Sequence, residues 1–92
     1  MAEKRIKAKP AVVFTDLEDG SGVLLDLDSK FYYSLNETGC FMWKAFERKG
    51  DLDADKLVDI LIREYEVGTK EAEQDVEDFL SSLAKEGLIQ LS

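Results

Sequence analysis

Hydrophobic and polar residues alternate in two neighbouring segments of the first half of the chain. In residues 22–28, one face carries Val23, Leu25 and Leu27, and the polar face carries Leu24, Asp26 and Asp28. In residues 30–35, the inward face carries Phe31, Tyr33 and Leu35, and the outward face carries Lys30, Tyr32 and Ser34. Such alternation is typical of half-buried strands. Because only a short polar link separates the two segments, they are predicted to form a β-hairpin.

A third strand is predicted ahead of the hairpin. Residues 11–19 are rich in β-branched and aromatic side chains, and the stretch EDGSG that begins at Glu18 carries turn signals. Sequential strands usually pair with one another. The simplest arrangement is therefore a three-stranded antiparallel sheet in which residues 30–35 form one edge.

The second half of the chain shows the three- and four-residue apolar spacing of amphipathic helices. Three helices are predicted, each from a polar cap residue to a glycine: Asn36 to Gly50, Asp53 to Gly68, and Thr69 to Gly87. Strands followed by helices predict an α+β fold, a three-stranded antiparallel β-sheet followed by three α-helices. This order is also compatible with a winged helix-turn-helix. The C-terminal tail LIQLS either adds a strand or packs loosely.

The charge of the chain is unevenly distributed. Its 92 residues, a single-domain length, hold 12 basic and 20 acidic residues, for a net charge of −8. Four basic residues and one acidic residue give residues 1–10 a net charge of +3, which leaves −11 for the remainder. We therefore expect a flexible basic arm over residues 1–10 and one domain over residues 11–92. An acidic domain repels nucleic acid and anionic lipid.

The sequence lacks the residues on which several kinds of function depend. Histidine, the commonest general base and metal ligand, is absent, and the single Cys40 excludes an internal disulfide and a cysteine-cluster metal site. There is no glycine loop that would cradle a phosphate. No apolar run approaches the roughly 20 residues that span a bilayer. Because no apolar core follows the basic residues 1–10, we expect this segment not to be a signal peptide. We expect a cytoplasmic binding protein, not an enzyme, without metal or cofactor, and we expect Cys40 to be a small buried hydrophobe.

Binding of DNA through a winged helix is one alternative. In a helix-turn-helix pair the second helix enters the major groove, and here that would be the third helix of the chain. Its outward face would carry Lys70, Glu71, Glu73, Gln74, Glu77, Asp78, Ser81 and Ser82. Acidic residues dominate this face and would meet the phosphates with the wrong sign. Only the basic arm supports this alternative.

Two segments of the chain carry motifs with a recognisable spacing. The first has an LLDL strand, an aromatic strand ending in LN-x-TG, and a Trp in the next helix, formed by Leu24, Leu25, Asp26, Leu27, Tyr32, Tyr33, Leu35, Asn36, Thr38, Gly39 and Trp43. The second, DV-x-x-FL-x-x-L-x-x-x-GL, is formed by Asp75, Val76, Phe79, Leu80, Leu83, Gly87 and Leu88. In this order the two segments resemble the PqqD-like proteins, also called RiPP recognition elements, where RiPP denotes a ribosomally made, post-translationally modified peptide.

The resemblance implies a peptide-binding protein that is not itself an enzyme. Such a protein captures the leader segment of a precursor peptide and presents it to a modifying enzyme. That enzyme is often a radical S-adenosylmethionine (SAM) maturase and, in lasso-peptide systems, a leader peptidase. The pyrroloquinoline quinone pathway gives the family its name. The resemblance further implies that the leader adds as a strand beside residues 30–35, in a cleft bounded by the third helix.

The predicted sheet is consistent with this mode of binding, because the outer edge of residues 30–35 has no partner strand. The candidate peptide-binding residues are Lys30, Phe31, Tyr32, Tyr33, Ser34, Leu35, Asp75, Val76, Phe79 and Leu83. At the rim, a basic leader residue would meet Asp75, Asp78 and Glu86. Two alternatives stay open. In the first, the edge is covered by the third helix or by the C-terminal tail. In the second, it pairs with the same edge of a second copy in a homodimer.

Overall fold

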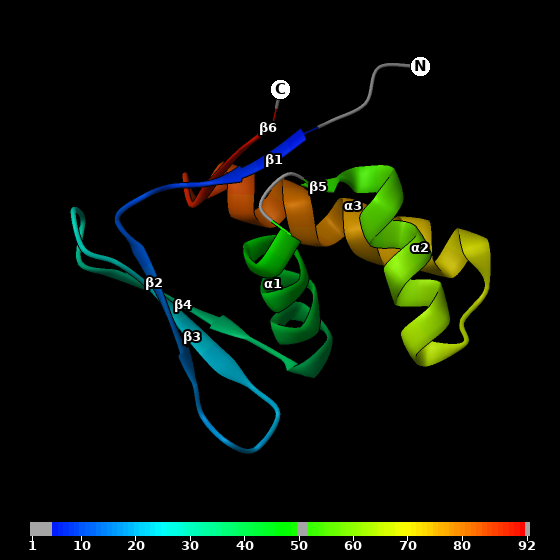
Figure 1. Cartoon of the computed structure of the whole chain (residues 1–92). Coiled ribbons are helices and arrows are strands. Elements are labelled where there is room, and N and C mark those ends of the chain that lie inside the picture. Colours follow the sequence, from blue (N-terminus) through cyan, green and yellow to red (C-terminus); the bar gives the residue numbers. More distant parts are fainter. Residues whose placement is uncertain (1–4, 50–51, 92) are drawn as a thin grey trace.

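A computed structural model describes residues 5–49 and 52–91 and has the predicted α+β fold (Figure 1). The helices are α1 (Glu37–Lys49), α2 (Ala54–Tyr65) and α3 (Thr69–Lys85). The strands are β1 (Arg5–Ala8), β2 (Val12–Asp16), β3 (Gly22–Asp26), β4 (Phe31–Leu35), β5 (Leu52–Asp53) and β6 (Ile89–Leu91). None of the described helices is both long and apolar enough to cross a bilayer.

The sheet β2-β3-β4 is the predicted antiparallel meander, and β4 forms one of its edges. The strand predicted over residues 22–28 ends two residues early, at Asp26, and residues 27–30 form the turn. Lys30 has a left-handed φ of 63° and its amide donates to the carbonyl oxygen of Asp26 at 2.7 Å. Lys30 therefore belongs to the turn and not to the edge strand.

The prediction that Leu24 and Asp26 lie on the polar face of β3 is wrong. Both residues are buried and, in the register of the sheet, Leu24 lies opposite Tyr33 on the same face. The Asp26 carboxylate can be buried because it accepts hydrogen bonds from Lys9 Nζ at 2.8 Å and from the Asp28 amide at 3.0 Å. Phe31 lies on the same face of β4 as Tyr33 and Leu35, as predicted, but it is not buried. It lies at one end of the strand, and its side chain is 40% exposed.

We expect the Asp26 carboxylate to make stability depend on pH. The hydrogen bond from Lys9 lowers the pKa of Asp26 below its ordinary value. A lowered folded-state pKa stabilises the fold above about pH 4, and this contribution is lost as the pH falls through the lowered pKa. Asp26→Asn should therefore lower the urea midpoint at neutral pH, and this deficit should shrink as the pH falls through the lowered pKa of Asp26. The exposed control Asp59→Asn should leave the midpoint unchanged, and an Asp26→Asn deficit that persists undiminished in acid would contradict this account.

A second sheet, β5-β1-β6, was not predicted. The prediction of a flexible arm is wrong for residues 5–8, because β1 pairs antiparallel with both β5 and β6. Ile6 anchors β1 in the core at 4% exposure, while its charged neighbours remain exposed. The C-terminal tail adds a strand, β6, beside β1 and not beside β4. Residues 1–4 of the predicted arm lie outside the described residues.

The predicted N-caps of α1 and α2 are confirmed, whereas the predicted end of α2 and the predicted cap of α3 are wrong. The side chain of Asn36 accepts from the Gly39 amide at 2.8 Å, and that of Asp53 accepts from the Lys56 amide at 2.8 Å. The predicted C-terminal Gly50 of α1 lies outside the described residues. Helix α2 does not run to Gly68, because the left-handed Glu66 caps it directly after Tyr65. Gly68 is instead the N-cap of α3, and Thr69 is the first helical residue.

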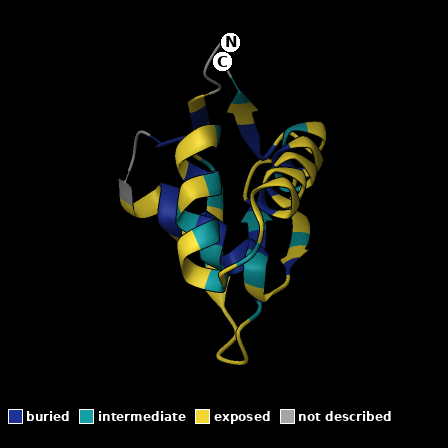
Figure 2. Ribbon diagram, turned by 90° about the vertical axis from the view of Figure 1, so that its right-hand side faces the viewer, coloured by how far each residue is buried: buried dark blue, intermediate teal, exposed yellow. Residues whose placement is uncertain are grey.

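The core lies where the three helices and both sheets meet (Figure 2). Trp43 of α1 is fully buried and contacts Phe46 edge to face, with ring centroids 4.6 Å apart. Helix α2 contributes Leu57 and Leu61. Cys40 is buried as predicted, and burial raises the pKa of its thiol. The core thus fixes α1 and α3 on either side of the end of β4.

Candidate functional site

The outer edge of β4 has unpaired backbone groups. Hydrogen-bonded pairs alternate along an antiparallel ladder. The amide of Leu27 donates to the carbonyl oxygen of Ala11, and the amide of Leu17 donates to that of Ser21. The odd-numbered residues on the β3 side therefore bond toward β2, and the even-numbered residues of β3 direct their backbone groups toward β4. In the β3–β4 register these are paired with Phe31, Tyr33 and Leu35. The amides and carbonyls of Tyr32 and Ser34 therefore point away from the sheet, and no described residue hydrogen-bonds to them.

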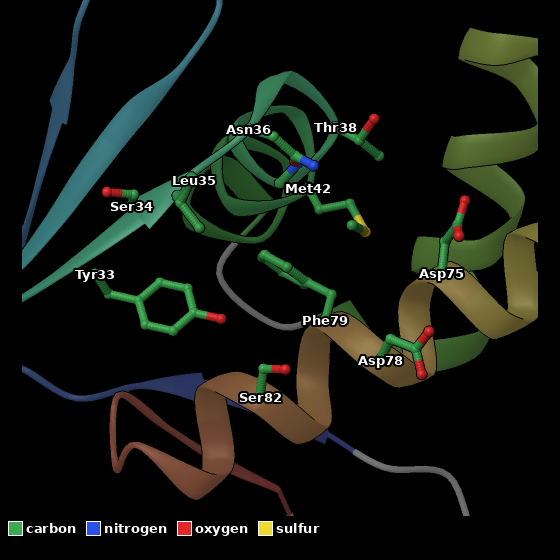
Figure 3. A pocket seen from close by; sticks show the side chains of 11 residues that line it. Tyr33, Ser34, Leu35, Asn36, Thr38, Met42, Asp75, Asp78, Phe79 and Ser82 are labelled. Carbon is green, nitrogen blue, oxygen red and sulfur yellow. The ribbon is translucent and has the colours of Figure 1, made fainter.

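A groove of about 650 Å³ runs beside this edge, between β4, the start of α1 and one face of α3. Its lining residues are Tyr33, Ser34, Leu35, Asn36, Thr38, Gly39, Met42, Asp75, Asp78, Phe79 and Ser82. Phe79 projects from α3 toward Leu35 and Met42, and Tyr33 lies at one end of the groove (Figure 3). Within the described residues neither α3 nor β6, which pairs with β1, covers the edge, so the space is open to a ligand strand.

Gly39 sets the spacing between α1 and α3 at the base of the groove. A Cβ atom at Gly39 would lie 3.3 Å from Phe79 Cε1 and 3.4 Å from Leu35 Cδ2, which is closer than most such contacts. These two neighbours come from α3 and β4. The absence of a side chain at Gly39 lets Phe79 sit against the end of β4.

The structure brings half of the predicted site residues together in the groove: Tyr33, Ser34, Leu35, Asp75 and Phe79. Val76 and Leu83 do not line it, because both are buried in the core of the domain. Lys30 lies in the hairpin turn. Phe31 and Tyr32 are exposed and outside the groove lining, although the backbone of Tyr32 lies on the free edge. Glu86 caps the C-terminus of α3 and does not reach the rim.

Several lining residues were not among the predicted site residues. Three come from the start of α1, namely Thr38, Gly39 and Met42, together with its cap Asn36. Asp78 was expected at the rim, and Ser82 follows Asp75 at a spacing of seven residues, so both lie on the helical stripe that contains Phe79. The seven-residue spacing could have predicted that Ser82 lines the groove. The contribution of α1 could not be predicted in this way, because it depends on how α1 and α3 pack against each other.

The groove is acidic at one end. Asp75 and Asp78 lie in its lining, and neither forms an ion pair with any residue of the described ranges 5–49 and 52–91. Asp78 Oδ1 accepts a hydrogen bond from the neutral Gln74 side chain at 2.9 Å. Two uncompensated carboxylates on this face of α3 disfavour contact with DNA phosphates. They leave the groove suited to a neutral or basic ligand.

The chain is similar to one known family and to solved structures. The family described as "Coenzyme PQQ synthesis protein D (PqqD)" matches residues 21–89. A structure of TbiB1 in complex with the TbiA(beta) leader peptide has 32% identity and a TM-score of 0.81, covering 91% of this chain and 94% of that one. A lasso peptide synthetase B1 complexed with the leader peptide has 26% identity and a TM-score of 0.78, covering 92% and 96%. No curated protein matches the chain.

Proposed function

Because the chain belongs to the PqqD family, as its sequence predicted, we propose that it binds the leader segment of a ribosomally made precursor peptide. The leader adds as a strand to the free edge of β4, beside α3. The observation that carries this proposal is the open groove along an edge whose Tyr32 and Ser34 backbone groups lack partners. Backbone hydrogen bonds at such an edge supply affinity, and the adjoining pocket supplies selectivity.

The similar structures support a leader peptide as the ligand. TbiB1 and the lasso peptide synthetase B1 were both solved with a leader peptide, and both align with nearly the whole of this chain. We propose that this chain acts as a binding partner and not as a catalyst, and that it presents the leader to a modifying enzyme. A radical SAM maturase and a lasso leader peptidase are the two candidate partners, and the similarity to a lasso peptide synthetase B1 favours the peptidase.

Calorimetric titration with a synthetic leader tests the proposal. The probe is the leader of a short precursor peptide, to be identified by searching the reading frames next to the gene for this chain. We expect saturable binding, and we expect Phe79→Ala to weaken it by about 2 kcal/mol, as for other aromatic residues at the centre of an interface. Glu77→Ala is the matched control, because Glu77 is exposed on the same helix but lies outside the groove.

The proposal fails if the folded wild-type chain does not bind the leader. It also fails if Phe79→Ala, with an unchanged circular dichroism spectrum, binds as tightly as the wild type. Sedimentation at several protein concentrations separates it from the alternative of a homodimer, in which the edge of β4 would pair with a second copy and leave no site for the peptide.

A further inference from the structure

The groove changes in chemical character along its length (Figure 3). Tyr33 and Ser82 line the end nearer the body of the sheet. In the middle, the ring of Phe79 faces Leu35 and Met42 and forms an apolar floor. Asp75 and Asp78 line the far end, where β4 has ended and α1 begins. A strand lying in this groove would therefore meet an aromatic, then an apolar, then an acidic environment.

Asp75 and Asp78 line the same groove as Phe79. Residues three and four apart on a helix are neighbours, so Asp75, Asp78 and Phe79 form one continuous stripe of α3. Among the described residues, ion pairs are formed by Lys9 and Lys44, and both bind carboxylates of the sheet β2-β3-β4 and its turn. The carboxylates of α3 form no ion pair with a described residue. With a net charge of −8, the chain also attracts cations at longer range.

The pairing of the added strand determines which of its side chains enter the groove. Residues directly opposite one another in a sheet have side chains on the same face. Peptide residues opposite Tyr33 and Leu35 therefore point into the groove, whereas those opposite Tyr32 and Ser34 point to the other face of the sheet. The next inward position lies two residues, or about 6.6 Å, beyond the residue opposite Leu35. That position extends past the end of β4, where Asp75 and Asp78 line the groove.

We propose, on the basis of the leader-binding function above, that the groove selects leaders with a basic residue two positions from an apolar one. The apolar side chain packs on Phe79 between Leu35 and Met42. The Lys or Arg side chain reaches Asp75 and Asp78, which are the specificity-determining residues for charge. Neither carboxylate has a cationic partner among the residues that the structure describes, and a basic residue at this spacing supplies one.

Selection from a display library of short random peptides tests this proposal. The wild-type chain is compared with the double variant Asp75→Asn/Asp78→Asn. The matched control is Glu73→Gln/Glu77→Gln, which makes the same change of charge on the same helix but outside the groove. We expect wild type and control to enrich peptides with Lys or Arg two positions from an apolar residue. The Asn variant should retain the apolar preference and lose the basic one.

The affinities of the selected peptides give a second readout. At low ionic strength each Asp→Asn change should lower the affinity for a basic peptide by roughly two- to fivefold, as expected for a solvent-exposed ion pair. Added salt should remove the difference in affinity between the variant and the wild type. The proposed charge selection is wrong if peptides selected by the wild-type chain shift the NMR signals of the β4 amides but show no preference for a basic residue at this spacing. It is also wrong if the control variant loses this preference to the same extent as the Asn variant. If no peptide is enriched, or enriched peptides leave the β4 amides unshifted, the leader-binding function fails with it.

Discussion

Replacement of Ser34 by proline is expected to weaken leader binding by at least about fivefold while the domain stays folded. Proline has no amide hydrogen, and its ring would occupy the space in which the peptide backbone must lie. The Ser34 amide points to the free edge and bonds no described residue, so the sheet loses no ladder hydrogen bond. The peptide loses one backbone hydrogen bond and is left with a carbonyl that cannot be satisfied, a loss of about 1–3 kcal/mol.

The matched control for this variant is Ser34→Ala. It retains the amide hydrogen and removes only an exposed hydroxyl, so its affinity should stay within about twofold of the wild type. Calorimetry gives the affinities, and far-ultraviolet circular dichroism shows that each variant is folded. If Ser34→Pro is folded and binds the leader normally, the strand does not add at this edge.

Replacement of Trp43 by alanine is expected to lower the free energy of unfolding by about 3–5 kcal/mol. Trp43 is fully buried in the core and its ring contacts Phe46 edge to face. Small domains are stable by only about 5–15 kcal/mol, so this loss would leave a large unfolded fraction under mild conditions. Urea denaturation, followed by circular dichroism because Trp43 is the only tryptophan, measures the effect.

The control Trp43→Phe removes the indole N–H but keeps an aromatic ring in the core. Trp43 Nε1 has no hydrogen-bond partner among the described residues, so the loss of this N–H should cost little stability. We expect Trp43→Phe to be clearly more stable than Trp43→Ala. Equal losses in the two variants would mean that the indole N–H and not the ring stabilises the core.

Local signals in the sequence were sufficient to predict most of the described elements. The caps Asn36 and Asp53 mark helix starts through hydrogen bonds to amides three residues away, which depend on no distant contact. The meander follows from alternation and short turns. The second sheet could not be predicted in this way, because β1 has only four residues and depends on partners that are far away in the sequence. The buried face of β3 was misassigned because Lys9, which neutralises Asp26, lies 17 residues away.

The candidate site was predicted only in part for a similar reason. The free edge of β4 follows from the strand order, and Asp75 and Phe79 follow from the periodicity of α3. The sequence could not show which side of the apolar stripe faces the groove, because the packing of α1 decides it. That packing buries Val76 and Leu83 in the core and leaves Phe79 beside Gly39 and Met42.

Hydrogen exchange at β4 tests most directly whether the leader adds as a strand. In the free chain the amides of Tyr33 and Leu35 should be protected by β3, whereas those of Tyr32 and Ser34 should exchange rapidly. With the leader bound, exchange at Tyr32 and Ser34 should slow by at least about tenfold. Phe14, on the opposite edge of the same sheet, should not change. If the leader binds but Tyr32 and Ser34 exchange as rapidly as before, strand addition to β4 is contradicted.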